Sequence, residues 1–161
     1  MDFDALFHKL YPSLFRYLHR LTGDADAADD IAQEAFVRLL RQSLPADEVR
    51  PWLFTVATNL VRDGIRKDGR RQRLILSAYV APGPPARPDE TVERSEAIEA
   101  VRNALARIPP RDRQLLLMRE EGFSYDEMAR AAGVAPGSIG TLLGRALRRF
   151  TQAYMAEEES R

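Results

Sequence analysis

The sequence predicts an all-α protein with two small helical domains joined by a proline-rich linker. Apolar residues recur at the three- and four-residue spacing of amphipathic helices along most of the chain. Runs that alternate apolar and polar residues, as half-buried strands do, are nearly absent. Four prolines and a glycine in the ten residues APGPPARPDE, 81–90, rule out a helix there and indicate a semi-rigid linker.

The first domain, residues 1–76, is expected to hold three helices. The first covers about residues 3–21, with a bend or restart at Pro12, because proline removes a helical hydrogen bond. The second covers about residues 24–42, and its aspartate-rich start suits the positive end of a helix dipole. After the loop SLPADEVRP, the third begins near Pro51, a favourable first-turn residue, and ends near residue 71.

The linker covers residues 77–90 and the second domain residues 91–155. An amphipathic helix ends at the proline pair 109–110, and RDRQLLLMREE forms another that ends before Gly122. SYDEMARAAG begins with a capping box, since Glu127 lies three residues after Ser124. A longer helix follows the turn at Gly133, and the acidic tail 156–161 is expected to fray.

Charge is unevenly distributed, although 24 basic and 24 acidic residues give a net charge of zero. Residues 1–49 hold nine acidic and five basic side chains, whereas residues 50–76 hold seven basic and two acidic ones. Residues 77–99 are acidic, and residues 100–161 are mildly basic. Such a chain can contact polyanions with some segments and basic partners with others.

Composition excludes several classes of protein. Cysteine is absent, so disulfides and thiolate metal sites are ruled out. The acidic start of the chain does not resemble a signal peptide, and no apolar run approaches the roughly 20 residues that span a bilayer. His8 and His19 stand alone, and no glycine-rich phosphate loop follows a strand. We therefore expect a soluble, cytoplasmic protein with no metal, no cofactor and no catalytic activity.

The last two helices have the spacing of a helix-turn-helix, with a short helix, a tight turn at residues 133–135 and a longer helix. Apolar residues at helical spacing, Leu147 and Phe150 among them, are expected to pack the pair together. Arg145, Arg148 and Arg149 near the end of the longer helix suit contacts to DNA phosphates. The spacing alone also fits an ordinary helical hairpin.

The third helix of the first domain has two different faces. Trp52, Leu53, Val56 and Leu60 indicate a buried face, although Trp52 could also stack on an unpaired base. A second face is almost purely basic and polar, which suits a nucleic-acid backbone better than a solvated surface of mixed charge. Its members are Thr55, Asn59, Arg62, Arg66 and Arg70.

The second helix presents a compact acidic patch of Asp29, Asp30, Gln33 and Glu34, with Phe36 near the edge of its apolar face. Carboxylates on neighbouring turns can bind a metal or transfer protons, but no clustered histidine supports that chemistry here. A docking face for a basic partner is the preferred interpretation, and simple exposure to solvent is the alternative.

The chain resembles the small, two-domain bacterial sigma factors of the extracytoplasmic-function (ECF) group, in the sigma-70 family of RNA polymerase subunits. LTGDADAADDIAQEAFVRLLRQ and PWLFTVATNLVRDGIRK resemble their first domain, sigma region 2. IPPRDRQLLLMREEGFSYDEMARAAGVAPGSIGTLLGRALRRF resembles their second domain, sigma region 4. The resemblance is collinear and covers residues 3–150.

The resemblance implies that the first domain binds core RNA polymerase and recognises and melts the minus-ten promoter element. Its second helix would contact the clamp helices of the largest polymerase subunit through Asp29, Asp30, Gln33, Glu34 and Phe36. Residues 43–49 would form the loop that holds a flipped base, since a pocket can replace the contacts of an unstacked base. The minus-ten surface would comprise Trp52, Thr55, Asn59, Arg62, Arg66, Lys67 and Arg70.

The resemblance also implies that the second domain recognises the minus-thirty-five element and packs on the polymerase flap. The linker would run toward the RNA exit path, and an anti-sigma factor would be the expected inhibitor. The DNA-contacting residues of the last helix and its turn would be Pro136, Ser138, Thr141, Leu142, Arg145, Arg148 and Arg149.

The last helix departs from the family pattern GTVKSRLHRAR, in which a lysine, an arginine and a histidine face DNA. Gly140, Leu142 and Gly144 occupy those positions here, and each glycine costs a helix about 0.8–1 kcal/mol relative to alanine. The departure fits a loss of minus-thirty-five recognition, a closer approach of the helix backbone to a partner, or drift in a subfamily that uses other contacts.

Two further functions stay open from the sequence. A stand-alone helix-turn-helix regulator would bind duplex promoter DNA without polymerase and would not need the acidic patch. A sigma-like interaction module would bind polymerase or an anti-sigma factor and scarcely contact DNA, and the glycines of the last helix favour it. An enzyme is the weakest alternative, because no catalytic constellation is present.

Overall fold

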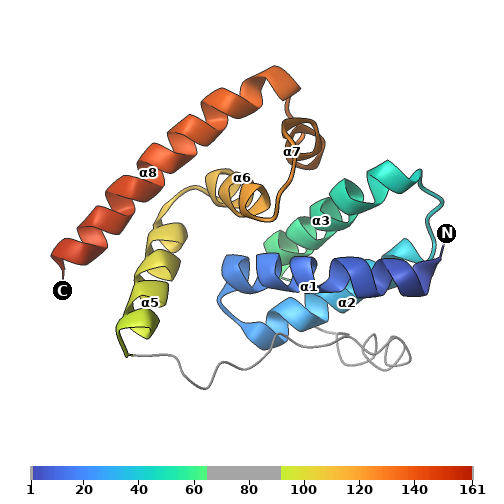
Figure 1. Cartoon of the computed structure of the whole chain (residues 1–161), viewed down its shortest axis with the longest axis horizontal. Coiled ribbons are helices and arrows are strands. Elements are labelled where there is room, and N and C mark those ends of the chain that lie inside the picture. The colour runs from blue at the N-terminus through green and yellow to red at the C-terminus, as the bar shows by residue number, and fades with distance from the viewer. Residues whose placement is uncertain (1, 65–91, 161) are drawn as a thin grey trace. The chain divides into compact units, whose positions relative to one another are not determined.

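The computed structural model describes residues 2–64 and 92–160, and all regular structure in these ranges is helical (Figure 1). The chain divides into two compact units, Met1–Pro84 and Pro85–Arg161. The expected all-α class and pair of helical units are confirmed. The expected end of the first domain at residue 76, the linker at 77–90 and the expected start of the second domain at residue 91 lie outside the described residues. Within the described ranges, no helix has the length and apolar character needed to cross a membrane.

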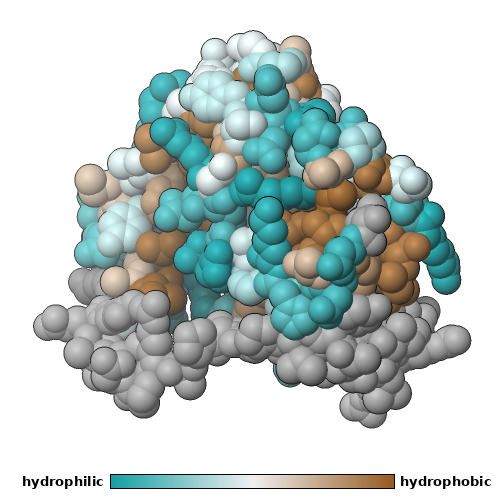
Figure 2. Space-filling view, turned by 45° about the vertical axis from the view of Figure 1, so that its right-hand side comes forward, coloured by the Kyte–Doolittle hydropathy of each residue, from teal (hydrophilic) through white to brown (hydrophobic). Residues whose placement is uncertain are grey.

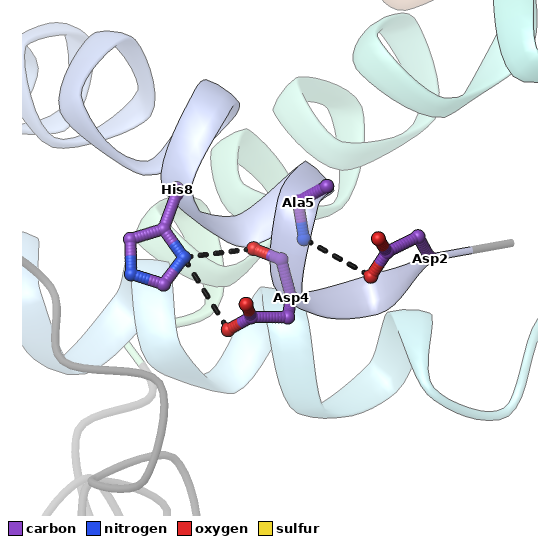
Figure 3. Close-up of polar contacts among 4 residues, drawn as sticks. All are labelled: Asp2, Asp4, Ala5 and His8. Atoms are coloured by element: carbon purple, nitrogen blue, oxygen red, sulfur yellow. Dashed lines mark hydrogen bonds and ion pairs between the residues drawn. The ribbon is translucent and has the colours of Figure 1, made fainter.

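The first unit begins with α1, Phe3–Thr22. Asp2 caps it, since Asp2 Oδ1 accepts a hydrogen bond from the Ala5 N–H at 3.2 Å (Figure 3). One turn later, His8 Nδ1 lies 2.9 Å from the Asp4 carbonyl oxygen and 3.3 Å from Asp4 Oδ1. The helix continues through Pro12 and ends at Gly23, whose φ of 72° places it in the left-handed region. The expected restart at Pro12 does not occur.

Helix α2, Ala25–Leu39, is capped by Asp24, whose Oδ1 accepts hydrogen bonds from the N–H groups of Asp26 and Ala27. Its buried face packs on α1 and α3. An aromatic cluster fills the junction with α1, where the ring centroids of Phe7 and Phe36 are 4.8 Å apart.

Helix α3, Ala46–Asp63, begins five residues before the expected start at Pro51. Pro45 occupies the N-cap position of this helix, and Pro51 lies inside it. Asp47 and Glu48 then occupy the first turn, where acidic side chains favour the helix dipole. Val49 and Pro51 are buried in the unit's core. The helix ends at Gly64, and the expected end near residue 71 lies outside the described residues.

One buried hydrogen bond links α1 to α3. Tyr17 of α1 and Thr58 of α3 have their hydroxyl oxygens 2.7 Å apart, and both residues are buried. Because a buried hydroxyl without a partner costs about 1–3 kcal/mol, this bond fixes how α3 lies against α1.

The second unit contains four α-helices and one short 3-10 turn within the described residues. They are α5, Val92–Arg107; α6, Pro110–Glu120; α7, Tyr125–Ala132; η2, Pro136–Ser138; and α8, Ile139–Glu159. The expected capping box of α7 is confirmed. Ser124 Oγ accepts from the Glu127 N–H at 3.1 Å, and Glu127 Oε1 accepts from the Ser124 N–H at 2.9 Å.

Helix α8 packs on α5, α6 and α7 and forms one side of the core of the second unit. Its inner face consists of Ile139, Leu143 and Ala146, all buried. The acidic tail was expected to fray, but α8 continues to Glu159. The reason is Glu157, whose Oε1 lies 2.8 Å from Arg107 Nη2 and whose Oε2 accepts from Asn103 Nδ2 at 3.3 Å. These contacts hold the last turns of α8 against α5.

Candidate protein and nucleic-acid interfaces

Asp29 of the acidic patch is engaged inside the first unit. The Tyr11 hydroxyl of α1 donates a hydrogen bond to Asp29 Oδ1. Gln33 Nε2, one turn along α2, lies 3.0 Å from both carboxylate oxygens of Asp29. Asp29 is partly buried and Gln33 is buried. The pair therefore helps to hold α1 against α2, in addition to adding negative charge to the surface.

Asp30 and Glu34 lie on the outer side of α2, four residues apart. Both are partly buried, and Glu34 Oε1 accepts from Arg38 Nε at 3.0 Å. Gln33 Oε1 and Glu34 Oε2 are buried acceptors without a hydrogen-bond donor among the described residues. The partly exposed carboxylates of Asp30 and Glu34 therefore give this side of α2 its negative charge.

Phe36 was expected at the polymerase contact, and the structure corrects this. Its ring is 0% exposed and packs against the rings of Phe3, Phe7 and Tyr11. At 100° per residue, Phe36 points toward α1, whereas Val37 follows Asp30 on the outer side. Val37 is partly exposed and Leu40, three residues on, is 47% exposed. The spacing 30, 33, 37, 40 is the sequence signal that places Val37 and Leu40 on the same side of α2 as Asp30.

The polar face of α3 holds the residues expected to contact DNA. Asn59 and Arg62 are exposed, and Thr55 is partly buried, with its Oγ1 donating to the Pro51 carbonyl at 2.7 Å. Trp52 was expected mainly in the core, but it is partly exposed and shares this face through the spacing 52, 55, 59, 62. Leu53 and Leu60 form the buried side instead. Arg66, Lys67 and Arg70 lie outside the described residues.

The loop expected at residues 43–49 is shorter than the sequence indicated. Residues 46–49 form the first turn of α3, and Val49 is 1% exposed. Only residues 43–45 of that range are outside a helix, before the start of α3. A base held here would therefore contact the loop and the exposed start of α3, with Asp47 and Glu48 beside it.

The helix-turn-helix is formed by α7, the turn at Gly133 to Ala135, η2 and α8. Gly133 has a φ of 69°, and the Val134 N–H bonds to the Ala129 carbonyl at 3.1 Å, which closes α7. Gln114 Nε2 of α6 donates to the Ala131 carbonyl, so α6 supports the end of α7. This frame fixes the direction in which α8 leaves the turn.

The residues expected to contact DNA on α8 do not share one face. Thr141, Arg145 and Arg148 are exposed on the side opposite the buried Leu143. Pro136 is exposed in η2, Ser138 is partly buried at the N-cap position, and Leu142 is partly buried. Arg149 points toward α6, where its Nη1 lies 2.8 Å from Asp112 Oδ2.

Neither glycine of α8 is required by packing inside the unit. A Cβ on Gly140 would lie 3.8 Å from Tyr125 Cε2, and one on Gly144 would lie 3.6 Å from Arg148 Nη1. Both distances are ordinary van der Waals contacts. Leu147, expected to pack the two helices, is 52% exposed. Gly140 and Leu147 are therefore exposed on α8, and Gly144 is partly buried.

Comparison with known proteins identifies both units. Residues 6–71 match the family Sigma-70 region 2, and residues 98–150 match the family Sigma-70, region 4. The ECF RNA polymerase sigma factor EcfG of Rhodopseudomonas palustris is 34% identical over 139 residues, which cover 84% of this chain and 75% of EcfG. The chain belongs to the ECF sigma factors.

Other relatives agree with this family. SigE of Mycolicibacterium smegmatis, an ECF RNA polymerase sigma factor, is 28% identical over 99% of this chain, which spans 63% of the length of SigE. The fold is similar to that of the sigma factor RpoE from Bartonella quintana, solved in complex with the anti-sigma factor NepR. That match has a TM-score of 0.68 and 22% identity and covers 94% of this chain and 96% of the other.

The family regions correspond to the surfaces described above. Region 2 of this sigma factor includes most of α1, all of α2 and all of α3. Region 4 includes most of α5 and the helix-turn-helix, and its match ends at Phe150. Helix α8 continues for nine residues after that match, to Glu159.

Proposed function

We propose that this ECF sigma factor binds core RNA polymerase in the cytoplasm and directs it to specific promoters, with no enzymatic activity of its own. The observation behind the proposal is the order of three surfaces along one chain. An acidic and apolar face on α2 precedes a polar and basic face on α3, and a helix-turn-helix follows in the second unit. A protein that only bound duplex DNA would need the last of these alone.

The outer face of α2 is the proposed polymerase contact. Asp30 and Glu34 supply negative charge for basic side chains of the clamp helices, and Val37 and Leu40 supply exposed apolar surface. Asp29 and Gln33 border this face and orient it through their contacts with each other and with Tyr11. A core of apolar contacts with charges at its rim is typical of specific interfaces.

The polar face of α3 is the proposed minus-ten contact. Arg62 is placed to bind the phosphate backbone, and Asn59 can bond a base edge. Trp52, partly exposed on the same face, can stack on an unpaired base and so favour the melted state of the promoter. Thr55 lies between them, and the basic residues Arg66, Lys67 and Arg70 follow in the sequence.

The exposed side of α8 is the proposed minus-thirty-five contact. Thr141, Arg145 and Arg148 are the residues that this side offers to base edges and phosphates, with Pro136 and Ser138 at the start of the helix. Leu142 is only partly exposed and can contact a thymine methyl group. This side of α8 has fewer polar hydrogen-bond donors than the family pattern provides. The first unit would therefore supply more of the promoter specificity.

An anti-sigma factor is the proposed regulator of this chain. The RpoE structure was solved in complex with the anti-sigma factor NepR. A protein that covers the outer face of α2 or the exposed side of α8 would prevent polymerase or promoter binding. The exposed apolar residue Leu40 on the outer face of α2 fits such a partner.

Run-off transcription with core polymerase and genomic promoter fragments tests the proposal. Promoter-specific transcripts are expected with the wild-type chain and should disappear with Asp30→Arg, because the new charge repels the basic clamp. Glu99→Arg, an identical charge change at an exposed site on α5, is the matched control and should leave transcription unchanged. Tight duplex binding without polymerase would favour a stand-alone regulator. Polymerase binding without any transcript would favour an interaction module.

A further inference from the structure

The outer side of α8 bears a row of small and apolar residues, Gly144, Leu147, Thr151 and Met155, of which Gly144 is partly buried and the other three are exposed. On the face of the molecule drawn in Figure 2, hydrophobic residues are exposed among hydrophilic ones. The two most exposed large hydrophobic residues in the described ranges both lie in this row, Leu147 at 52% and Met155 at 59%. The spacing 144, 147, 151, 155 places all four on one face of the helix. We name this face the α8 stripe.

The α8 stripe does not serve the core of its own unit. Ile139, Leu143 and Ala146 fill that role from a different side of the helix. Half of the stripe, Thr151 and Met155, also lies beyond the region 4 match, which ends at Phe150. The stripe is therefore an apolar surface that neither the fold nor the proposed promoter contact explains.

The charges along α8 identify the partner. Arg145, Arg148 and Arg149 lie in its middle, and the last turn contains Glu157, Glu158 and Glu159. Glu157 pairs with Arg107 of α5, whereas Glu158 and Glu159 are exposed, and negative charge at the C-terminal end of a helix is unfavourable to the helix dipole. A second α8 that runs in the opposite direction would bring the acidic end of one copy to the basic middle of the other.

The register of such a pair follows from the stripe. With Thr151 on the two-fold axis, Leu147 faces Met155 of the second copy, and Gly144 faces Glu158 of the second copy. Arg148 Nη1 lies 3.6 Å from the position of a Cβ on Gly144, so the guanidinium already covers that glycine. Glu158 of the second copy would therefore meet Arg148. A parallel pair would instead oppose arginine with arginine and glutamate with glutamate.

We propose that two copies of this chain associate through antiparallel α8 helices centred on Thr151. Two apolar contacts and two Arg148–Glu158 pairs make a small interface, so the association is weak and concentration-dependent. The pairing does not depend on the proposed function. Arg148 also belongs to the proposed minus-thirty-five surface, so pairing and promoter binding would exclude each other.

Disulfide trapping tests the register, because the natural chain contains no cysteine. Two Thr151→Cys residues on the two-fold axis would lie within the roughly 4.4–6.8 Å Cα separation that a disulfide needs. The matched control is Gln152→Cys, which is also exposed but lies about 100° around the helix. Mild oxidation should give a covalent dimer with Thr151→Cys and little with Gln152→Cys. No dimer, or equal yields from both variants, overturns the proposal.

A charge swap tests the pairing of Arg148 with Glu158 by sedimentation equilibrium of the full chain. Arg148→Glu and Glu158→Arg should each weaken dimerisation about fivefold or more, since each places like charges opposite one another. The double variant restores opposite charges and should dimerise within about twofold of the wild type. Circular dichroism confirms that each variant is folded. A double variant as weak as the singles, or a wild-type chain that stays monomeric at every concentration, contradicts the proposal and leaves the α8 stripe to a different protein.

Discussion

Arg149 of α8 donates a hydrogen bond to Asp112 of α6, with 2.8 Å between Nη1 and Oδ2. The Asp112 side chain is only 6% exposed, whereas the Arg149 side chain is 51% exposed. A buried carboxylate needs a partner, because an unpaired buried charge is costly. Arg149 therefore fixes α8 on α6. Its main role is in the fold and not in a phosphate contact.

The first prediction is that Arg149→Ala destabilises the second unit by about 1–3 kcal/mol, since it leaves the Asp112 carboxylate buried without its cation. Urea unfolding of the full chain measures the change. Arg145→Ala, on the exposed side of the same helix, is the matched control and should change stability by no more than about 0.5 kcal/mol. Equal effects of the two variants would show that the Asp112 pair is not structural.

The second prediction is that Gly140→Ala and Gly144→Ala each stabilise the chain by up to about 0.8–1 kcal/mol. The added Cβ meets only ordinary contacts, at 3.8 Å from Tyr125 Cε2 and 3.6 Å from Arg148 Nη1. Thermal unfolding measures the gain. Gly133→Ala is the contrasting control and should destabilise the chain, because its φ of 69° is strained for any other residue. A loss of stability from the α8 variants would mean that the backbone there depends on glycine.

The third prediction separates two adjacent acidic residues on α2. Asp29→Ala removes the acceptor of Tyr11 and Gln33 and should cost about 1–3 kcal/mol of unfolding free energy. Asp30→Ala should weaken binding to core polymerase more than Asp29→Ala does, because it removes negative charge from the outer side of α2. Unfolding curves and a fluorescence binding assay with core polymerase provide the two measurements. Tyr11→Phe removes one donor only and should reproduce part of the Asp29→Ala loss. The reverse pattern would exchange the roles assigned to Asp29 and Asp30.

Local sequence signals predicted the features that depend on neighbouring residues alone. The capping box of Ser124 and Glu127 is confirmed because both of its hydrogen bonds form within one turn. The start of α3 was misplaced because Pro45 and Pro51 both fit the beginning of a helix, and the residues between them are helical. The tail was misjudged because the residues that hold Glu157 lie about fifty residues earlier, in α5.

Side-chain directions were the least predictable part of the candidate site. Phe36 and Val37 are adjacent, so the helical pattern places both near the edge of the apolar face, and the aromatic residues of α1 decide which one is buried. On α3 the helical pattern likewise predicts that both Trp52 and Leu53 are buried, but only Leu53 is. On α8 it predicts that Leu147 is buried, but this residue is exposed. The pairing of Arg149 with Asp112 joins residues 37 positions apart, and no local pattern indicates it.

The fourth prediction concerns promoter melting. Arg62→Ala should reduce open-complex formation more than binding to core polymerase, since Arg62 lies on the α3 face and not on α2. Permanganate reactivity of unpaired thymines measures melting, and a fluorescence assay measures polymerase binding. Arg16→Ala, which removes one positive charge from an exposed site on α1, is the matched control and should leave melting unchanged.

A promoter with a pre-opened minus-ten region distinguishes melting from recognition of the single strand. If Arg62 acts on melting, this template should restore most of the transcription that Arg62→Ala loses. Trp52→Ala should stay impaired on the same template, because stacking on an unpaired base is worth about 1–3 kcal/mol whether or not the strands are already separated. A fall in core binding with Arg62→Ala and normal permanganate reactivity would instead assign the polar face of α3 to polymerase.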